Sequence, residues 1–176
     1  AIRIPGIITK EKINILKQKT DDWVKIYQSA VKPILVKPFY VRPTWYDAKN
    51  DYINILIDPA LSFGTGHHET TSSCLEAIGR YAKKDMFVID VGCGSGLLGI
   101  GAYKLGAMVD ICDTNQVAID DSIKNFKINA SQYNKAWVGS IVQSNKQYDI
   151  VVANIVADIL IFIAKDLKNG LKNNSI

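Results

Sequence analysis

The sequence predicts an α/β fold in which helices cover both faces of a doubly wound, mostly parallel sheet. From residue 86 onward, short apolar runs typical of buried strands alternate with longer segments that have helical spacing. Strands that alternate with helices of this length imply βαβ crossovers, which place the strands parallel and bury both faces of the sheet. A hydrophobic content of 48% is enough to fill such a core.

The first third of the chain has a different texture. Residues 10–28 carry apolar side chains at helical spacing. Three prolines, Pro33, Pro38 and Pro43, then punctuate the β-rich pieces "ILV", "FYV" and "YINILID", which favours a linker followed by a strand or hairpin. We therefore expect residues 1–32 to be a short N-terminal helical or linker segment and residues 33–176 to be the main domain.

The remaining elements follow from the pattern in chain order. The predicted sequence is a glycine-bearing loop (61–68), a helix (69–82), a strand (86–91), a helix closed by Gly106 (96–106), a strand (107–113), a helix (115–130), a short strand (136–141), a strand (148–155) and a helix ending at Gly170 (156–170). The chain stops at "NNSI", where another strand should begin, so "YDIVVA" would be left as an apolar sheet edge. We expect the C-terminal strands of the sheet to be absent from this chain.

Composition limits the kinds of partner and compartment. The net charge is +4 and the lysines are scattered, so the basic residues are read as a solvated surface, and no direct DNA binding is expected. Three cysteines without a C-x-x-C pair fit reduced thiols better than a disulfide frame or a zinc site. No apolar stretch reaches the ~18 residues of a membrane span. We expect a cytoplasmic monomer with no membrane contact.

A glycine-rich loop follows the first strand of the alternation. Gly94 to Gly99 match G-x-G-x-x-G, the fingerprint of a dinucleotide site. Read from Asp90, the same stretch is D-x-G-x-G-x-G, which suits S-adenosylmethionine. Both cofactors need these glycines, because the loop must turn tightly, approach the ligand and let the next helix pack on the sheet.

Of two acids near the loop, Asp90 favours the second cofactor, whereas Asp113 suits both. A dinucleotide would place a pyrophosphate near Asp90, whereas the ammonium and sulfonium of S-adenosylmethionine suit a carboxylate there. Asp113 ends the next strand, where a carboxylate accepts hydrogen bonds from ribose hydroxyls. Structural alternatives stay open for both acids: Asp90 can cap loop amides, and Asp113 can cap the helix that follows it.

Asn154 lies at the end of the apolar strand in "VVANIV". The carboxyl edge of an open α/β sheet is where ligands bind, so we expect this side chain beside the reacting group. A carboxamide has both a donor and an acceptor and can hold a nucleophilic nitrogen in line with a methyl group. The alternative is that Asn154 caps the helix after it.

The motifs together resemble one enzyme family. "LIDPALSFGTGHHETT", "VIDVGCGSGLLGIGAYKLGA", "DTNQVAI" and "VVANIVADIL" are similar to the class I S-adenosylmethionine-dependent methyltransferases, and within them to the bacterial methyltransferases of large-subunit ribosomal protein L11. The resemblance implies a Rossmann-like fold and methylation of the ribosomal protein on its N-terminal amine and lysine side chains. It makes residues 33–176 a C-terminally incomplete, S-adenosylmethionine-binding catalytic domain.

The resemblance also implies site residues. The implied cofactor contacts are Phe63, Gly64, Thr65, Gly66, Thr71, Asp90, Gly92, Gly94, Asp113 and Asn154. Asn154 is the implied catalytic residue, and no metal is expected. His67 and His68 are weaker candidates for a proton relay.

Rival functions remain open at this point. They are a methyltransferase acting on another protein or a small-molecule amine, an NAD-binding oxidoreductase, and a catalytically inactive binding module. A nucleic-acid base as the target is disfavoured, because no proline or aromatic residue follows Asn154 to stack a flipped base.

Overall fold

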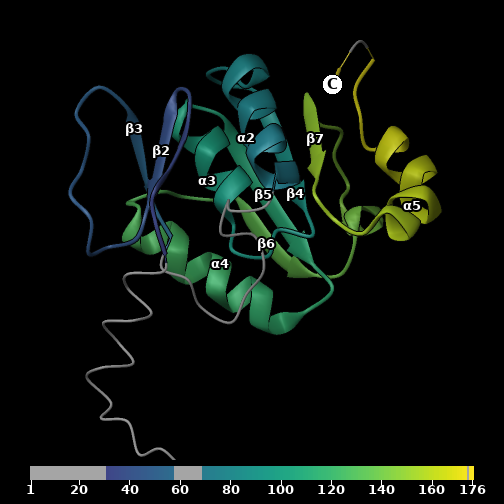
Figure 1. The fold of residues 1–176 in the computed structure, drawn as a ribbon. Helices are drawn as coiled ribbons and strands as arrows, with labels where there is room; N and C mark the ends of the chain where they lie inside the picture. Colours follow the sequence, from purple (N-terminus) through teal and green to yellow (C-terminus); the bar gives the residue numbers. More distant parts are fainter. Residues whose placement is uncertain (1–30, 58–68, 174) are drawn as a thin grey trace, which may run out of the picture. The chain divides into compact units, whose positions relative to one another are not determined.

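A computed structural model describes residues 31–57, 69–173 and 175–176 (Figure 1). The predicted N-terminal helical or linker segment lies almost entirely outside these ranges, and both it and the domain boundary after residue 32 stay predictions. In the described ranges no helix has the length and apolar character needed to cross a membrane.

A four-stranded parallel sheet forms the centre of the described chain. Its strands are β4 (Phe87–Val91), β5 (Met108–Asp113), β6 (Lys135–Val138) and β7 (Ile150–Ala153). They are arranged in the order β6-β5-β4-β7, and all three pairings are parallel. The prediction of a parallel sheet is confirmed, and the carboxyl ends of all four strands lie at one edge.

In the described part of the chain, four helices connect and cover these strands (Figure 1). They are α2 (Glu69–Tyr81), α3 (Leu97–Lys104), α4 (Gln116–Ile128) and α5 (Ala157–Asn169). Successive side chains of a strand point to opposite faces. One face packs with α2, α3 and α4 in a core that includes Leu75, Ile100 and Phe126. The other face, around Ile89 and Tyr148, packs with α5 and the short turn η2 (Ile141–Gln143). The sheet is therefore doubly wound, as predicted.

The stretch 136–141 holds a short strand, as predicted, but β6 covers only its first half. Gly139 has φ +145° and Ser140 is the N-cap of η2, so β6 stops at Val138. The residues after Val138 therefore lie at the carboxyl edge rather than within the sheet.

A second sheet contains β1 (Ile34–Val36), β2 (Phe39–Arg42) and β3 (Ile53–Leu56). The first pair is antiparallel, as a hairpin requires, but β3 pairs parallel with β2. Phe39 and Ile55 are fully buried in the same core as α2 and α3. This sheet leads into residues 58–68, the predicted glycine-bearing loop.

The outer edge of β7 differs from the expectation of an open apolar edge. Tyr148 N donates to Gly170 O at 2.8 Å, and Lys172 N donates to Tyr148 O at 3.0 Å. Further along, Val151 N donates to Ile176 O at 3.0 Å. The chain turns back after α5. Gly170, Lys172 and Ile176 therefore hydrogen-bond backbone groups next to and within β7 that the sequence pattern leaves unpaired.

Candidate functional site

The carboxyl ends of the parallel strands open into a cavity of about 570 Å³. That volume is within the range of small-molecule sites. Of the predicted site residues, the structure brings six together in the cavity lining: Thr71, Asp90, Gly92, Gly94, Asp113 and Asn154. The other predicted residues, Phe63, Gly64, Thr65, Gly66, His67 and His68, lie outside the described part of the chain.

The glycine loop runs along the floor of this cavity. Gly92 and Gly94 have φ of +71° and +51°, a region that side chains other than glycine rarely adopt. A Cβ atom on Gly92 would also overlap Cγ2 of Ile155. The turn is tied to the neighbouring strand, because the amides of Gly92 and Cys93 both donate to Cys112 O, at 2.8 and 3.1 Å. At Gly92 and Gly94 the backbone itself therefore lines the cavity, with no side chain to take up its space.

Asp90 is buried beneath the loop. Its side chain is 1% exposed, and its Oδ2 accepts a hydrogen bond from Gly99 N at 3.0 Å in the first turn of α3. The capping alternative for this acid is thus present in the structure, and Asp90 also lines the cavity. Burial raises the pKa of Asp90 to about 7. A cation bound in the cavity would favour the charged carboxylate.

Asp113 hydrogen-bonds the glycine loop and the residues that follow its own strand, β5. Its Oδ2 accepts from Gly94 N at 3.1 Å, and its Oδ1 accepts from Asn115 N at 2.9 Å. It does not cap α4, because Asn115 occupies the N-cap position and accepts from Val117 N at 2.9 Å. Each carboxylate oxygen has a second lone pair, so Asp113 keeps acceptor capacity for a ligand hydroxyl.

Asn154 follows β7 directly and connects to the opposite wall. Its Nδ2 donates to Oγ1 of Thr71, in the first turn of α2, at 2.8 Å. The alternative that Asn154 caps α5 is wrong, because Val156 occupies that position and no side chain caps the helix. The carboxamide is therefore held by a tertiary hydrogen bond.

Sequence reasoning missed several lining residues. They are Thr70, Val91, Cys93, Ser95, Leu97, Leu98, Thr114, Gly139, Ser140, Val156, Ile159 and Ile163. Gly139 and Ser140 follow a parallel strand, so the rule that ligands bind at the carboxyl edge could have found them. Ile159 and Ile163 are four residues apart on α5, and helical spacing places such residues on one face. Together with Ile155 they make one wall of the cavity apolar.

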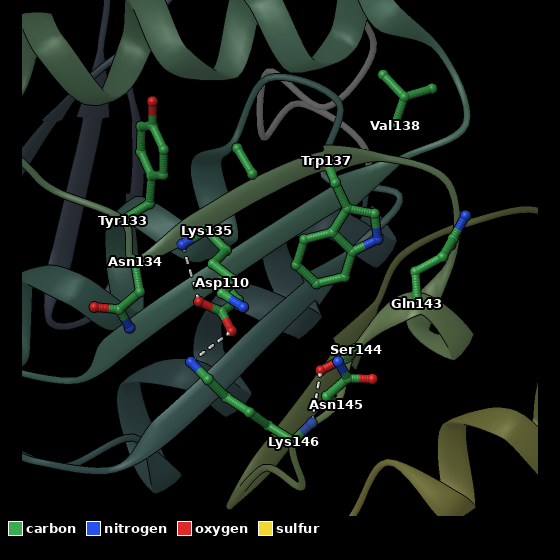
Figure 2. A pocket seen from close by; sticks show the side chains of 11 residues that line it. Asp110, Tyr133, Asn134, Lys135, Trp137, Val138, Gln143, Ser144, Asn145 and Lys146 are labelled. Atoms are coloured by element: carbon green, nitrogen blue, oxygen red, sulfur yellow. Dashed lines mark hydrogen bonds and ion pairs between the residues drawn. The ribbon is translucent and has the colours of Figure 1, made fainter.

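A second cavity, of about 530 Å³, lies beside β6 (Figure 2). Its buried acid, Asp110, accepts hydrogen bonds from Lys135 N at 3.0 Å, Lys146 Nζ at 3.2 Å and Tyr148 Oη at 2.9 Å. Figure 2 shows Lys146 reaching across the cavity to this carboxylate. These contacts tie the acid to β6 and the segment before β7, so we assign Asp110 a structural role.

Comparison with known proteins decides the family. The family model described as ribosomal protein L11 methyltransferase (PrmA) matches residues 4–176. The chain belongs to the ribosomal protein L11 methyltransferase family. A family member from Nitratiruptor sp. is 50% identical over 170 residues, which cover 96% of this chain and 61% of the relative. One from Campylobacter concisus is 48% identical over 161 residues, covering 92% and 58%. The chain thus spans about three fifths of these relatives.

Solved structures agree with this family and with the predicted fold class. The ribosomal protein L11 methylase of Lactobacillus delbrueckii subsp. bulgaricus superposes with a TM-score of 0.75 at 30% identity, covering 82% of this chain and 77% of that one. The magnesium protoporphyrin IX methyltransferase of Synechocystis, solved with bound SAM, superposes at 0.51 with 17% identity, covering 66% and 62%. The second likeness concerns the fold alone. The Rossmann-like class I methyltransferase fold is confirmed.

Proposed function

We propose that the protein transfers methyl groups from S-adenosylmethionine to amino groups of ribosomal protein L11, namely its lysine side chains and its N-terminal amine. The observation that carries this proposal is that the glycine loop, Asp113 and Asn154 line one cavity in a chain of this family. A ribosomal substrate is consistent with a place in the cytoplasm, and we propose that the protein acts there as a monomer.

The chemistry of the cavity fits a cationic donor. Two carboxylates, Asp90 and Asp113, line it. Among the described lining residues there is no lysine or arginine that could neutralise a pyrophosphate. The ammonium and sulfonium of S-adenosylmethionine would gain from Asp90, whereas this acid would repel the pyrophosphate of a dinucleotide. Asp113 suits both ligands, because both carry a ribose.

Each wall of the cavity has a role in holding this donor. Asp113 would accept hydrogen bonds from the ribose hydroxyls, and the backbone at Gly92 and Gly94 would lie against the methionine part. When bound, the donor supplies a methyl group that its sulfonium already activates. The chain therefore has to align donor and amine, and alignment can contribute roughly 7–11 kcal/mol.

The incoming amine must be neutral to attack. Deprotonation at pH 7 costs about 4.6 kcal/mol for a lysine with an ordinary pKa of ~10.4, but only about 1 kcal/mol for an α-amine. The apolar wall at Ile155 and Ile159 favours the neutral form by desolvation. Asn154 would accept a hydrogen bond from the amine without a negative charge, so it would favour the unreactive ammonium less than a carboxylate would.

The test is mass spectrometry of purified ribosomal protein L11 after incubation with the full-length protein and S-adenosylmethionine that carries a trideuteromethyl group. We expect trideuteromethyl groups on lysines and on the N-terminal amine, and none on L11 whose amines have been acetylated. The same incubation with other amine compounds in place of L11 tests the alternative. If L11 stays unmodified and another amine acquires the label, the substrate assignment is overturned in favour of another amine methyltransferase.

A further inference from the structure

The hydrogen bond between Thr71 and Asn154 links segments that are 83 residues apart. Thr71 is 2% exposed, and both side chains line the cavity. The bond joins the first turn of α2 to the carboxyl end of β7. The side chain of Asn154 is therefore held at its backbone by β7 and at its Nδ2 atom by α2.

This bond distinguishes the two ends of the Asn154 carboxamide. Nδ2 is engaged with Oγ1 of Thr71 at 2.8 Å. Within the described part of the chain, Oδ1 accepts no hydrogen bond, and it is not among the buried atoms that lack a partner. The acceptor end is therefore the end left for a ligand in the cavity.

We propose that Thr71 is a positioning residue that presents Oδ1 of Asn154 to the incoming amine. The inference rests on the proposed function, since it concerns how that amine is oriented. It gives Thr71 a role through Asn154, in contrast to the direct cofactor contact that the family resemblance implies.

The orientation matters because of which electron pair attacks. An amine that donates N–H to Oδ1 keeps its lone pair free for the methyl group. If the carboxamide were turned over, Nδ2 would donate a hydrogen bond to that same lone pair and occupy it. A carboxamide without an anchor can adopt both orientations, so loss of the Thr71 hydroxyl should lower the rate of the chemical step.

The first test compares variants of Thr71 at saturating donor. Thr71→Val removes the hydroxyl and keeps the shape of the side chain. It should lower kcat by about 3- to 10-fold, which corresponds to the free energy of one neutral hydrogen bond. Thr71→Ser keeps the hydroxyl and should restore kcat. Ser73→Ala is the matched control, because it removes an exposed hydroxyl of the same helix that bonds Glu69 O at 3.0 Å.

Donor affinity separates this role from a cofactor contact. If Thr71 acts through Asn154, Thr71→Val leaves the Kd of S-adenosylhomocysteine unchanged in calorimetric titration. A weakened Kd together with a normal kcat at saturating donor would overturn the inference and make Thr71 a cofactor ligand. If Thr71→Val does not fold, Thr71→Ala makes the same deletion with a smaller side chain.

A double-mutant cycle tests the coupling directly. In an Asn154→Ala background, Thr71→Val should have no further effect on kcat, because the group that it positions is gone. Multiplicative effects of the two substitutions would show that they act independently, which contradicts the inference.

A measurement on the ligand-free protein does not depend on activity. The side-chain amide resonances of Asn154, assigned by their loss in Asn154→Asp, should shift and exchange faster in Thr71→Val and return in Thr71→Ser. Unchanged resonances would rule out the hydrogen bond. A protein that shows the bond but does not methylate L11 would contradict the proposed substrate and leave the Thr71–Asn154 link standing.

Discussion

At the scale of single residues, the two acids of the cavity are held in different ways. Asp90 is buried and bonds one amide of α3, whereas Asp113 accepts from the amides of Gly94 and Asn115. Their different surroundings lead to different predictions for ligand binding.

Donor affinity should depend on pH through Asp90. Burial raises the pKa of this carboxyl to about 7, and a bound cation lowers it, so binding of the cation releases a proton. The affinity for S-adenosylmethionine should therefore rise with pH between about 6 and 7.5 and then level off. Calorimetric titrations at several pH values measure this. Asp90→Asn, which keeps an acceptor for Gly99 N, should flatten the profile; an equal slope in wild type and variant would exclude Asp90 as its source.

Loss of Asp113 should weaken binding through the ribose. Asp113→Ala should cost about 1.5–3 kcal/mol of S-adenosylhomocysteine affinity, the range for hydrogen bonds that involve a charged group. An analogue without the two ribose hydroxyls is the control, and the variant should bind it almost as well as wild type does. An equal loss for both ligands would mean that Asp113 acts only by tying Gly94 and Asn115 together.

At the scale of elements, one side chain fastens the end of α4 to the second sheet. Asn129 is 6% exposed; its Oδ1 accepts from Leu56 N at 2.8 Å, and its Nδ2 donates to Leu56 O at 2.7 Å. The side chain thus imitates a paired strand at the end of β3, the strand that leads into residues 58–68.

Asn129→Ala should destabilise the fold, because it leaves both backbone groups of Leu56 without this partner. An unsatisfied buried group costs about 1–3 kcal/mol, and these groups are part-buried, so the free energy of unfolding should fall by up to that amount in urea denaturation. Asn145→Ala removes an exposed carboxamide and should stay within about 0.5 kcal/mol of wild type. If the two variants unfold at the same denaturant concentration, the hydrogen bonds between Asn129 and Leu56 contribute nothing measurable to stability.

The elements also show what local pattern can predict. Strands β4, β5 and β7 and their helices follow from the alternation of apolar runs, since each run is buried on both faces. The parallel pairing of β2 with β3 does not follow. The local sequence of short β-rich pieces, such as those near Phe39 and Ile55, does not indicate which strand they pair with or in which direction. The end of β6 depended on the backbone of Gly139, which the apolar pattern does not report.

At the scale of the whole molecule, the sheet brings distant residues to one edge. Asp90, Asp113 and Asn154 could be predicted because each lies at or near the end of a predicted parallel strand, and such ends share an edge. The hydrogen bond of Thr71 to Asn154 could not be predicted, because it depends on how α2 packs. The engagement of Asp110 by Lys146 and Tyr148 likewise required the fold.

The central claim is that this cavity holds a methyl donor rather than a dinucleotide. Calorimetric titration of the full-length protein with S-adenosylhomocysteine and, separately, with NAD tests the claim most directly. We predict one-to-one binding of S-adenosylhomocysteine that Asp113→Ala weakens, and no heat of binding with NAD. Binding of NAD that Asp113→Ala weakens, with none for S-adenosylhomocysteine, would contradict the account.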